Sequence, residues 1–427
     1  MKRRQFIQSA SATSALGAMG LMSGCATTGG TNGPKVVVVG GGYGGATAAK
    51  YVRMWSDYGI QVTLIEPNAS FISCPISNLV IGGSKTMADI TTSYDNLVKR
   101  HGVNLVKDYV TQIDPDKRIV KLAGGSEVPY DRLILSPGVD FMFDAIPGLN
   151  KAGAQEKVLH AWKAGAQTVA LRKQLEAMPD GGVYALSIPL APYRCPPGPY
   201  ERACQVAEYF SKAKPKSKVL ILDANDDVTS KGPLFKKAWA ERYKGIVEYR
   251  SKHNAIDVDA ATNTLKFEFN DDVKANVLNV IPPMRAGEIA VKSGLATANK
   301  RWCEVDFLTF ESKAAKNIHV LGDSIQIAPA MPKSGHMANQ HGKTCAAAVV
   351  ALLSGKTPNN MPIYNNTCYS FVSSEDVVHV ASVHAYDADK KTMLAVPGSG
   401  GVSSAANELE GRYAMAWARN IWADTLA

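Results

Sequence analysis

The cysteines are the residues of this sequence best suited to redox chemistry. Seven are present, and Cys25 lies in an N-terminal segment that we expect to be processed. The other six are Cys74, Cys195, Cys204, Cys303, Cys345 and Cys368. None stands in a CxxCH arrangement, so we expect no c-type haem on this chain, and no cysteine–histidine cluster has the spacing of a metal site. Disulfide chemistry is open to them in an oxidising compartment.

A glycine-rich turn near the N-terminus has the pattern of a dinucleotide-binding loop. Gly40, Gly42 and Gly45 follow a run of β-branched residues and open a predicted helix, and Glu66 ends the next strand 21 residues after Gly45. The first glycine permits a tight turn, the second lets the backbone approach a pyrophosphate, and the third brings helix against strand. The helix N-terminus would hold the pyrophosphate, and Glu66 would accept hydrogen bonds from the adenosine ribose. A purely structural glycine turn is the weaker alternative.

The elements that would position these residues alternate between strands and helices. Six strands are predicted, at residues 36–39, 61–65, 132–135, 183–188, 219–222 and 318–321. Alternation of this kind is typical of a doubly wound α/β fold. Two βαβ starts, near Lys35 and near Gly181, predict two Rossmann-like dinucleotide-binding domains.

Two later segments resemble the flavin motifs of two-domain flavoprotein disulfide reductases. Residues 130–138 resemble the second motif, which ends in Gly138, and residues 319–324 resemble the C-terminal motif, whose aspartate is Asp323 here. The resemblance implies that the first domain binds FAD and that Asp323 holds the ribityl chain of the cofactor. The fold class it implies is α/β, with two Rossmann-like domains of this type and a small C-terminal domain.

The second domain lacks the glycine loop of relatives that use NAD(P)H. Residues 187–202 read SIPLAPYRCPPGPYER in its place. Prolines remove backbone donors and restrict φ, so this loop cannot offer the N–H cradle that a pyrophosphate needs. We therefore predict no nicotinamide binding there.

These motifs divide the chain into five segments. We expect an export signal and linker at 1–30, the first part of the FAD domain at 34–150, the second Rossmann-like domain at 151–278, the return to the FAD domain at 279–358 and a separate flavin-capping or interface domain at 359–427.

Four segments give a closer resemblance over essentially the whole mature chain. FISCPISN at 71–78, YRCPPGPYE at 193–201, MPKSG at 331–335 and YNNTCYS at 364–370 resemble the flavoprotein subunit of flavocytochrome c sulfide dehydrogenase. This family oxidises sulfide and passes electrons to haem on a separate c-type cytochrome subunit. The resemblance therefore implies sulfide as substrate, a heterodimer, and haem only on the partner.

The resemblance also implies roles for four residues. Cys74 matches the cysteine bonded to the flavin 8α-methyl group, although Pro75 departs from the family pattern and puts that bond in question. Cys195 and Cys368, 173 residues apart, match the redox-active pair, and Glu201 matches a carboxylate that would accept a proton. The alternatives are an inert thiol at Cys74, a structural disulfide between Cys195 and Cys368, and an ordinary exposed glutamate. Buried inert thiols are the favoured interpretation of Cys204, Cys303 and Cys345.

A predicted helix at 337–353, with Ser334 as its N-cap, has a further expected role. Its N-terminus would stabilise negative charge on reduced flavin, by about 0.3–2 kcal/mol. Lys333 would add a positive charge there. A solvated lysine before an ordinary core helix is the alternative.

The N-terminus predicts export. Lys2-Arg3-Arg4-Gln5-Phe6-Ile7 resembles the twin-arginine consensus, and the weakly apolar stretch after it is shorter than the roughly 20 residues of a transmembrane helix. Residues 22–25 also resemble a lipoprotein cleavage box, so lipid attachment at Cys25 stays open. We expect a periplasmic protein with no transmembrane segment.

The net charge of +9 is spread along the chain, which argues against a nucleic-acid partner and suits an anionic substrate or an acidic protein. Two other functions remain open. One is a sulfide:quinone oxidoreductase, and the other is a non-catalytic flavoprotein that acts in thiosulfate oxidation.

Overall fold

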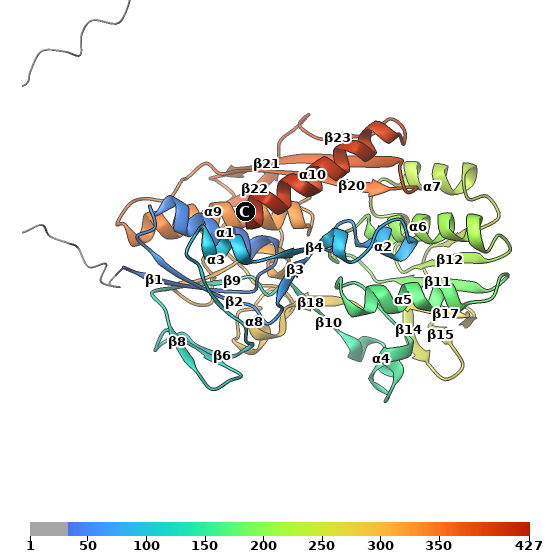
Figure 1. Cartoon of the computed structure of the whole chain (residues 1–427), viewed down its shortest axis with the longest axis horizontal. Coiled ribbons are helices and arrows are strands. Elements are labelled where there is room, and N and C mark those ends of the chain that lie inside the picture. The colour runs from blue at the N-terminus through green and yellow to red at the C-terminus, as the bar shows by residue number, and fades with distance from the viewer. Residues whose placement is uncertain (1–32) are drawn as a thin grey trace, which may run out of the picture. The chain divides into compact units, whose positions relative to one another are not determined.

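The computed structural model describes residues 33–427. The predicted export signal and Cys25 lie outside the described residues. Two parallel sheets, at opposite ends of the view in Figure 1, dominate the described part.

The first parallel sheet has the order β19-β9-β1-β2-β5. Its strands are β1 (Lys35–Val39), β2 (Gln61–Ile65), β5 (Asn104–Val106), β9 (Arg132–Leu135) and β19 (Ile318–Val320). Four of the predicted strands lie here within a residue or two of their expected ends. β1 is central and pairs in parallel with β2 and β9, which explains its continuous β-branched run.

Two helices pack closely beside this sheet because glycines face each other. They are α1 (Tyr43–Trp55) and α9 (Gly335–Leu353), which lie side by side in Figure 1. A Cβ on Gly342 would lie 2.6 Å from the Gly44 carbonyl oxygen, and one on Gly44 would lie 2.3 Å from Leu321 Cδ1. A side chain at Gly342 would push α9 away from α1, and one at Gly44 would collide with Leu321.

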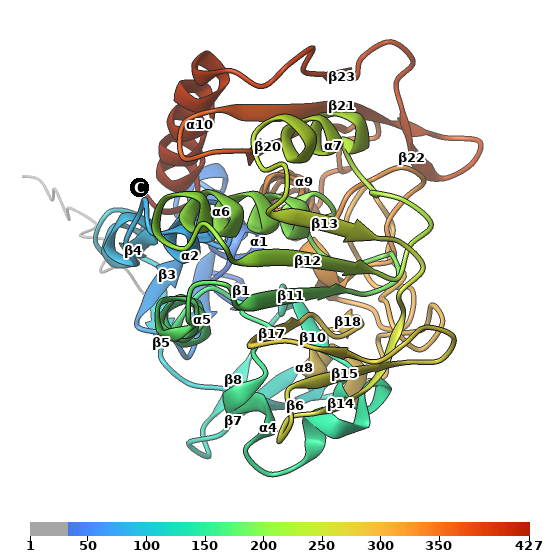
Figure 2. The ribbon, with the colours of Figure 1, turned by 90° about the vertical axis from the view of Figure 1, so that its right-hand side faces the viewer.

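The second parallel sheet has the order β13-β12-β11-β17. Its strands are β11 (Val183–Ile188), β12 (Lys218–Asp223), β13 (Val247–Arg250) and β17 (Val277–Val280), and its helices are α5 (Ala166–Ala177), α6 (Gly198–Ala213) and α7 (Gly232–Glu241). Figure 2 shows this sheet face on. The expected domain boundary at 278 falls inside β17, so this sheet extends slightly further along the chain than the prediction.

The chain crosses between the two sheets through an antiparallel pair. β10 (Val139–Phe141) leaves the first sheet, and β18 (Met284–Ala286) returns to it. Two antiparallel three-stranded sheets are appended: β6 (Val110–Asp114), β7 (Ile119–Leu122) and β8 (Glu127–Pro129), and β14 (Ala255–Asp259), β15 (Thr264–Phe267) and β16 (Val273–Lys274).

The C-terminal section consists of an antiparallel sheet and a long helix. These are β20 (Ile363–Phe371), β21 (Val377–Asp387), β22 (Thr392–Ala395), β23 (Gly401–Val402) and α10 (Glu408–Leu426). β20 contacts both α9 and α6, and α10 contacts α1. We predicted a separate domain, but buried residues such as Tyr364, Val378 and Ile421 belong to the same hydrophobic core as both parallel sheets.

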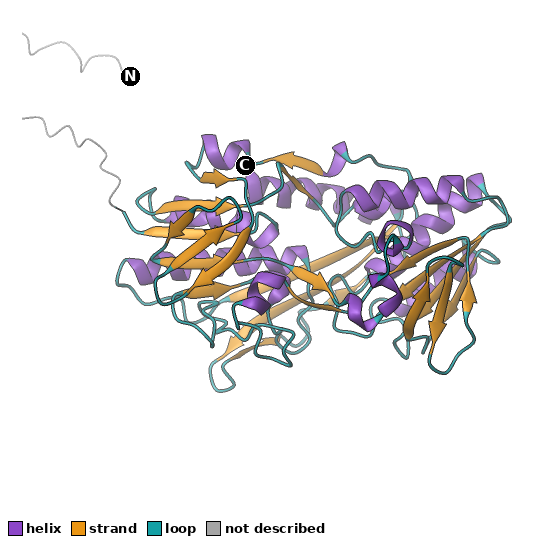
Figure 3. Cartoon of the chain, turned by 90° about the horizontal axis from the view of Figure 1, so that it is seen from below, coloured by secondary structure: helices purple, strands orange, loops and turns teal. Residues whose placement is uncertain are grey.

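The remaining elements are short. They are β3 (Ser70–Ile72), α2 (Ser77–Gly82), β4 (Thr91–Ser93), α3 (Asp95–Lys99), α4 (Ala154–Lys157), α8 (Glu288–Lys292) and the 3-10 turns η1 (Ala88–Ile90), η2 (Phe143–Ala145), η3 (Pro147–Asn150) and η4 (Gly322–Ser324). Figure 3 shows the strands gathered in two groups with helices beside each. Of the helices in residues 33–427, none has the length and apolarity required to cross a membrane.

Candidate active site

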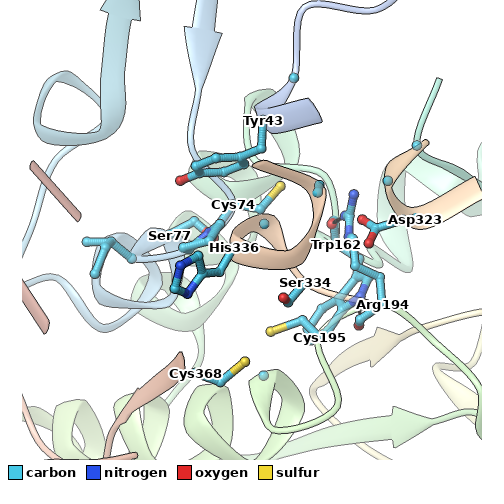
Figure 4. Close-up of a pocket in the computed structure, with 18 of the residues that line it drawn as sticks. Tyr43, Cys74, Ser77, Trp162, Arg194, Cys195, Asp323, Ser334, His336 and Cys368 are labelled. Atoms are coloured by element: carbon cyan, nitrogen blue, oxygen red, sulfur yellow. Dashed lines mark hydrogen bonds between the residues drawn. The ribbon is translucent and has the colours of Figure 1, made fainter. Parts of the chain in front are cut away.

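One pocket lies where both parallel sheets meet the C-terminal section. Its lining includes seven of the residues that the sequence singled out: Gly42, Cys74, Gly138, Cys195, Glu201, Asp323 and Cys368. They come from the glycine loop, the β3–α2, β9–β10 and β11–α6 loops, α6, η4 and β20. Figure 4 shows Cys195 and Cys368 with their sulfur atoms turned toward the same region, and Cys74 on another side of the pocket.

The glycine loop has the geometry that a dinucleotide needs. A Cβ on Gly45 would lie 1.9 Å from the Gly40 carbonyl oxygen, so only glycine lets α1 start this close to β1. Gly40 has a φ of 95°, where glycine is favoured. A Cβ on Gly42 would meet nothing within 4 Å, so its backbone is open to a ligand. The first turn of α1 contains no acidic residue and no side-chain cap, which leaves its N–H groups for an anion.

Glu66 stabilises the glycine loop through hydrogen bonds. Its Oε2 accepts a hydrogen bond from the Gly41 N–H at 2.7 Å, and its Oε1 accepts from the Asn68 backbone and side chain at 2.9 and 2.6 Å. The carboxylate is buried but does not line the pocket described above. Its contact with the adenosine ribose remains a prediction.

Asp323 and Gly138 fit a polyol chain. Asp323 Oδ1 is buried and has no hydrogen-bond partner among the described residues, which is unusual for a carboxylate unless a ligand completes it. Burial raises the pKa of Asp323, and nearby Arg194 opposes that shift. Gly138 has a φ of 69° and open space where a Cβ would stand. A flavin with its ribityl hydroxyls toward Asp323 therefore suits these residues.

Cys74 borders the pocket from the loop between β3 and α2. Its side chain is partly exposed, and its sulfur accepts from the Ala164 N–H at 3.5 Å. Pro75 lines the same wall, so the proline leaves Cys74 facing the pocket. Beside it, the Tyr43 hydroxyl lies 2.6 Å from Ser73 Oγ and accepts from Trp422 Nε1 at 2.9 Å.

Cys195 occupies the proline-rich loop before α6. Its φ is 59°, its N–H donates to the Lys333 carbonyl at 2.9 Å, and its own carbonyl accepts from the Gly198 N–H at 2.9 Å. A Cβ on Gly198 would lie 2.8 Å from Cys195 Sγ and 2.8 Å from the Trp162 ring. The loop is thus shaped to present this sulfur to the pocket. The predicted lack of nicotinamide binding stays a prediction.

Cys368 reaches the pocket from the middle of β20. Its sulfur accepts a hydrogen bond from Asn366 Nδ2 at 3.4 Å, and Asn366 Oδ1 accepts from Ser334 Oγ at 2.6 Å. Both Cys195 and Cys368 are free thiols in the structure. Burial raises the pKa of both thiols. The Cys368 sulfur raises the pKa of Cys195 further, whereas Lys231 opposes the effect of burial at Cys368.

Glu201 is buried, so the exposed-glutamate alternative is wrong. It is 7% exposed. Its Oε1 accepts from the Phe371 N–H at 2.9 Å and its Oε2 from Asn78 Nδ2 at 2.7 Å. Burial raises the pKa of its carboxyl group, and these two hydrogen bonds oppose the shift. A carboxyl group with a raised pKa close to two thiols is suited to accept a proton from them.

Lys333 needs a correction. Only 2% of it is exposed, so it is not a solvated lysine, and it does not line the pocket. Its ammonium donates to the carbonyls of Asp323 and Ile325 at 2.9 and 2.6 Å and lies 3.6 Å from the centre of the Trp302 ring. Burial lowers its pKa to about 7. Lys333 therefore positions η4 and, through its carbonyl, Cys195.

The predicted helix after Lys333 is confirmed. It is α9, and Ser334 caps it by accepting from the Met337 N–H at 3.0 Å. Ser334, Gly335 and His336 line the pocket, so the positive end of the α9 dipole faces the cavity.

Sequence reasoning missed Arg202, which joins the walls of the pocket. This side chain is 1% exposed and donates to Asn78 Oδ1, Asn279 Oδ1 and the carbonyls of His160 and Ala161 at 2.6–3.0 Å. Its guanidinium also lies 4.7 Å from the Trp162 ring centre. Its place directly after Glu201 was the available signal, but an arginine alone does not show whether it is buried.

The other cysteines lie away from the pocket. Cys204, Cys303 and Cys345 are completely buried, and burial raises the pKa of all three thiols. Within residues 33–427, no cluster of three His, Cys, Asp or Glu side chains could hold a metal ion.

The fold and the pocket define a flavoprotein of the pyridine nucleotide-disulphide oxidoreductase type, and that family model matches residues 34–177. The central domain of the flavocytochrome c sulfide dehydrogenase flavoprotein chain matches residues 168–282, and the flavin-binding domain of flavocytochrome c sulphide dehydrogenase matches residues 360–426. Two of these three models describe sulfide dehydrogenase flavoproteins, so the matches support a flavin-dependent oxidoreductase of the sulfide-oxidising type that binds FAD.

Relatives of two kinds are similar to this chain. The mitochondrial sulfide:quinone oxidoreductase of Mus musculus is 27% identical over 324 residues, which are 72% of this chain and 69% of that protein. The sulfide dehydrogenase flavoprotein chain of Chlorobaculum thiosulfatiphilum is 59% identical over 46 residues, which are 11% of this chain and 94% of that sequence.

A solved structure agrees on the fold. The sulfide:quinone oxidoreductase from Aquifex aeolicus superposes with a TM-score of 0.73 at 19% identity and covers 92% of this chain and 91% of that one.

Proposed function

We propose that this protein oxidises sulfide with FAD and a Cys195–Cys368 pair, and passes the electrons to a c-type cytochrome subunit. One observation carries the proposal. Two thiols that are 173 residues apart in the sequence line a single pocket with the residues that suit flavin and with a buried carboxylate.

The chemistry begins on the oxidised pair. Hydrosulfide attacks one sulfur of the Cys195–Cys368 disulfide, so that the S–S bond between the cysteines breaks and a persulfide and a thiolate form. A second hydrosulfide then takes the outer sulfur away as disulfanide and leaves a thiol. Re-forming the disulfide from this thiol and the thiolate releases one proton and two electrons. Glu201 would accept the proton.

Bound FAD supplies the two-electron acceptor and releases electrons one at a time. Residues of this chain would hold the FAD. The α1 N-terminus would bind the pyrophosphate, Asp323 the ribityl chain, and the α9 N-terminus would stabilise negative charge on the reduced ring.

An anaerobic sulfide titration tests the thiol chemistry. Wild-type protein should lose its oxidised-flavin absorbance with sulfide, and Cys195→Ser and Cys368→Ser should keep FAD but lose this response. Cys204→Ala is the matched control, because it removes a thiol from α6 outside the pocket. Full sulfide-dependent reduction in both serine variants would contradict the mechanism.

The covalent bond at Cys74 is a separate proposal. Its support is the position of the sulfur on the pocket wall. After acid precipitation, flavin should stay in the wild-type pellet and move to the supernatant in Cys74→Ser. Release of flavin from the wild type would show that FAD binds without a covalent bond.

A surface hollow offers a place for the acceptor. It is lined in part by Lys343, Tyr413 and Asp424, and it shares His336, Tyr369 and Trp417 with the flavin pocket. An acceptor seated there would be separated from the flavin by one layer of aromatic side chains, which suits electron transfer to the haem of a partner subunit.

A quinone acceptor is the second candidate, favoured by the length over which sulfide:quinone oxidoreductases match this chain. Reduced protein should be reoxidised by a c-type cytochrome and not by decylubiquinone if the first proposal holds. The reverse pattern would identify a quinone reductase. Failure of sulfide to reduce the flavin would instead favour a non-catalytic flavoprotein.

The periplasmic location remains a proposal supported by the twin-arginine pattern. Replacement of Arg3 and Arg4 by lysine should hold the protein in the cytoplasmic fraction. Labelling with radioactive palmitate, compared with Cys25→Ala, tests lipid attachment.

A further inference from the structure

A buried lysine lies next to one member of the cysteine pair. Lys231 precedes α7 and has a φ of 57°. Only 7% of it is exposed, and its Nζ donates to the Cys368 carbonyl at 2.9 Å and to Ser370 Oγ at 2.7 Å. No described carboxylate lies within salt-bridge distance of this ammonium group. It is a buried cation with neutral acceptors, an arrangement that is costly unless a negative charge forms nearby.

The geometry of β20 directs that charge toward Cys368. Side chains two residues apart in a strand point to the same face, so Ser370 Oγ lies on the face that carries Cys368 Sγ. Because Lys231 Nζ binds Ser370 Oγ and the Cys368 carbonyl, it stands on the sulfur side of the strand. Lys231 is the largest influence that lowers the pKa of Cys368, against the effect of burial.

The two cysteines therefore have different surroundings. Cys368 has a cation beside it and a hydrogen-bond donor in Asn366. Cys195 has no hydrogen-bond donor to its sulfur within residues 33–427. Burial, Cys368 and Glu201 raise its pKa, and Arg194 and Lys231 oppose them only as the smallest influences. The reciprocal effect is visible at Lys231, whose pKa burial lowers to about 8 while Cys368 is the largest influence raising it.

We propose that Lys231 is a positioning residue that stabilises Cys368 as the thiolate. The proposal rests on the function proposed above and deepens it. Hydrosulfide attacks Cys195, a new S–S bond forms there, and the bond from Cys195 to Cys368 breaks. The electron pair of that bond stays on Cys368, whose negative charge then faces the Lys231 ammonium. Cys195 becomes the persulfide carrier.

Other titratable groups surround the pair and must be considered in a pH experiment. They are Arg194 in the loop before α6, Glu201 on α6, Glu410 on α10 and His336 on α9. Burial lowers the pKa of His336 to about 4, so it is neutral over the useful range. Lys231 itself, with a pKa of about 8, and Glu201, with a raised pKa, are the groups that could change charge there.

Thiol alkylation tests the proposal without sulfide. The holoprotein is reduced with a phosphine, and iodoacetamide labelling of Cys195 and Cys368 is followed by peptide mass spectrometry between pH 5 and 10. Because only the thiolate reacts, Cys368 should be labelled at lower pH than Cys195. Lys231→Met should slow Cys368 labelling about tenfold at pH values below the midpoint of the variant's Cys368 labelling curve. The change at Cys195 should be smaller, because Lys231 is the last of the influences on that thiol.

Three comparisons make the result decisive. Lys236→Met removes an exposed lysine of α7, which pairs with Asp227, and should leave both labelling profiles unchanged. Lys231→Arg keeps the charge and should restore early labelling of Cys368. The double variant Glu201→Gln, Lys231→Met should not restore early labelling of Cys368.

Earlier labelling of Cys195 in the wild type, or an unchanged Cys368 profile in Lys231→Met, would overturn the proposal whatever the sulfide activity. The wild-type profile alone decides the matter if Lys231→Met does not fold. The Cys368 labelling profile could shift in Lys231→Met although sulfide does not reduce the flavin of the wild type. That result would leave the role of Lys231 intact and overturn the proposed function instead.

Discussion

Glu201 illustrates how burial changes the chemistry of one residue. Its carboxyl group stands among two thiols, a lysine and an arginine, and burial raises its pKa. Glu201→Gln should reduce the rate of sulfide-dependent flavin reduction by about 100-fold, the lower range for loss of a proton acceptor. Stopped-flow absorbance measures the rate, and an unchanged rate would remove Glu201 from the mechanism.

The same substitution predicts a pH-dependent change in stability. A carboxyl group whose folded pKa is raised destabilises the folded protein as pH rises above its ordinary value of 4.5, because the unfolded state ionises first. Wild type should therefore lose stability relative to Glu201→Gln between pH 4.5 and the folded pKa, and the difference should be constant below that window. Urea unfolding across this pH range is the measurement, and a difference that does not vary with pH would contradict the argument.

Gly198 matters to the site because it has no side chain. Gly198→Ala places a methyl group against Cys195 Sγ and Trp162, both 2.8 Å from the added Cβ. The displaced sulfur should react with sulfide more than tenfold more slowly, roughly the effect of a small misplacement of a reacting group, while FAD stays bound. Gly401→Ala, which adds a methyl group in open space, should react normally.

At the scale of elements, two long helices begin with equivalent caps that serve different purposes. Ser334 caps α9, and Asn407 caps α10 by accepting from the Glu410 N–H at 2.9 Å. Ser334→Ala and Asn407→Ala should each cost about 1 kcal/mol of stability. Only Ser334→Ala should also alter Cys368 labelling, because Ser334 orients Asn366 toward that sulfur. Equal labelling in both variants would show that this hydrogen-bond chain does not reach the thiol.

Hydrogen bonds also connect α10 to α1. Lys50 Nζ donates to the carbonyls of Ala423 and Asp424 at 3.2 and 2.9 Å, where the α10 dipole is negative. Trp422 reaches Tyr43 in the flavin pocket. α10 is thereby fixed to α1.

At the scale of the whole molecule, the C-terminal section closes a pocket that the two parallel sheets leave open. It contributes Cys368, Tyr369 and Trp417 to the lining. Trp417 lies between the flavin pocket and the surface hollow, with ring centres 5.7 Å from His336 and 6.2 Å from Tyr369.

This position predicts a selective defect. Trp417→Leu should slow reoxidation of the reduced protein by its acceptor several-fold and leave the reaction with sulfide unchanged. Tyr413→Leu, which changes the hollow alone, is the control. Equal slowing of both half-reactions in Trp417→Leu would indicate a general disturbance of the pocket.

Local sequence determined much of the fold. The β-branched run of β1, the three glycines and the N-cap at Ser334 are short-range signals, because each is set by neighbours within a few residues. Six predicted strands appear close to their expected bounds for the same reason. The resemblance of four separate segments to one family identified Cys74, Cys195, Glu201 and Cys368, which local patterns did not connect.

Tertiary structure alone decided the rest. Lys333 and Lys231 are both lysines beside helix starts, and no local pattern shows that one ammonium turns away from the pocket while the other turns toward Cys368. Burial of Glu201 and Arg202 depends on β20 and α2, which are distant in sequence. The sequence by itself therefore determined which elements form and which residues suit flavin and thiol chemistry. Only the packing of distant segments decided which charges face the sulfur atoms, because electrostatic and steric effects depend on distance in space.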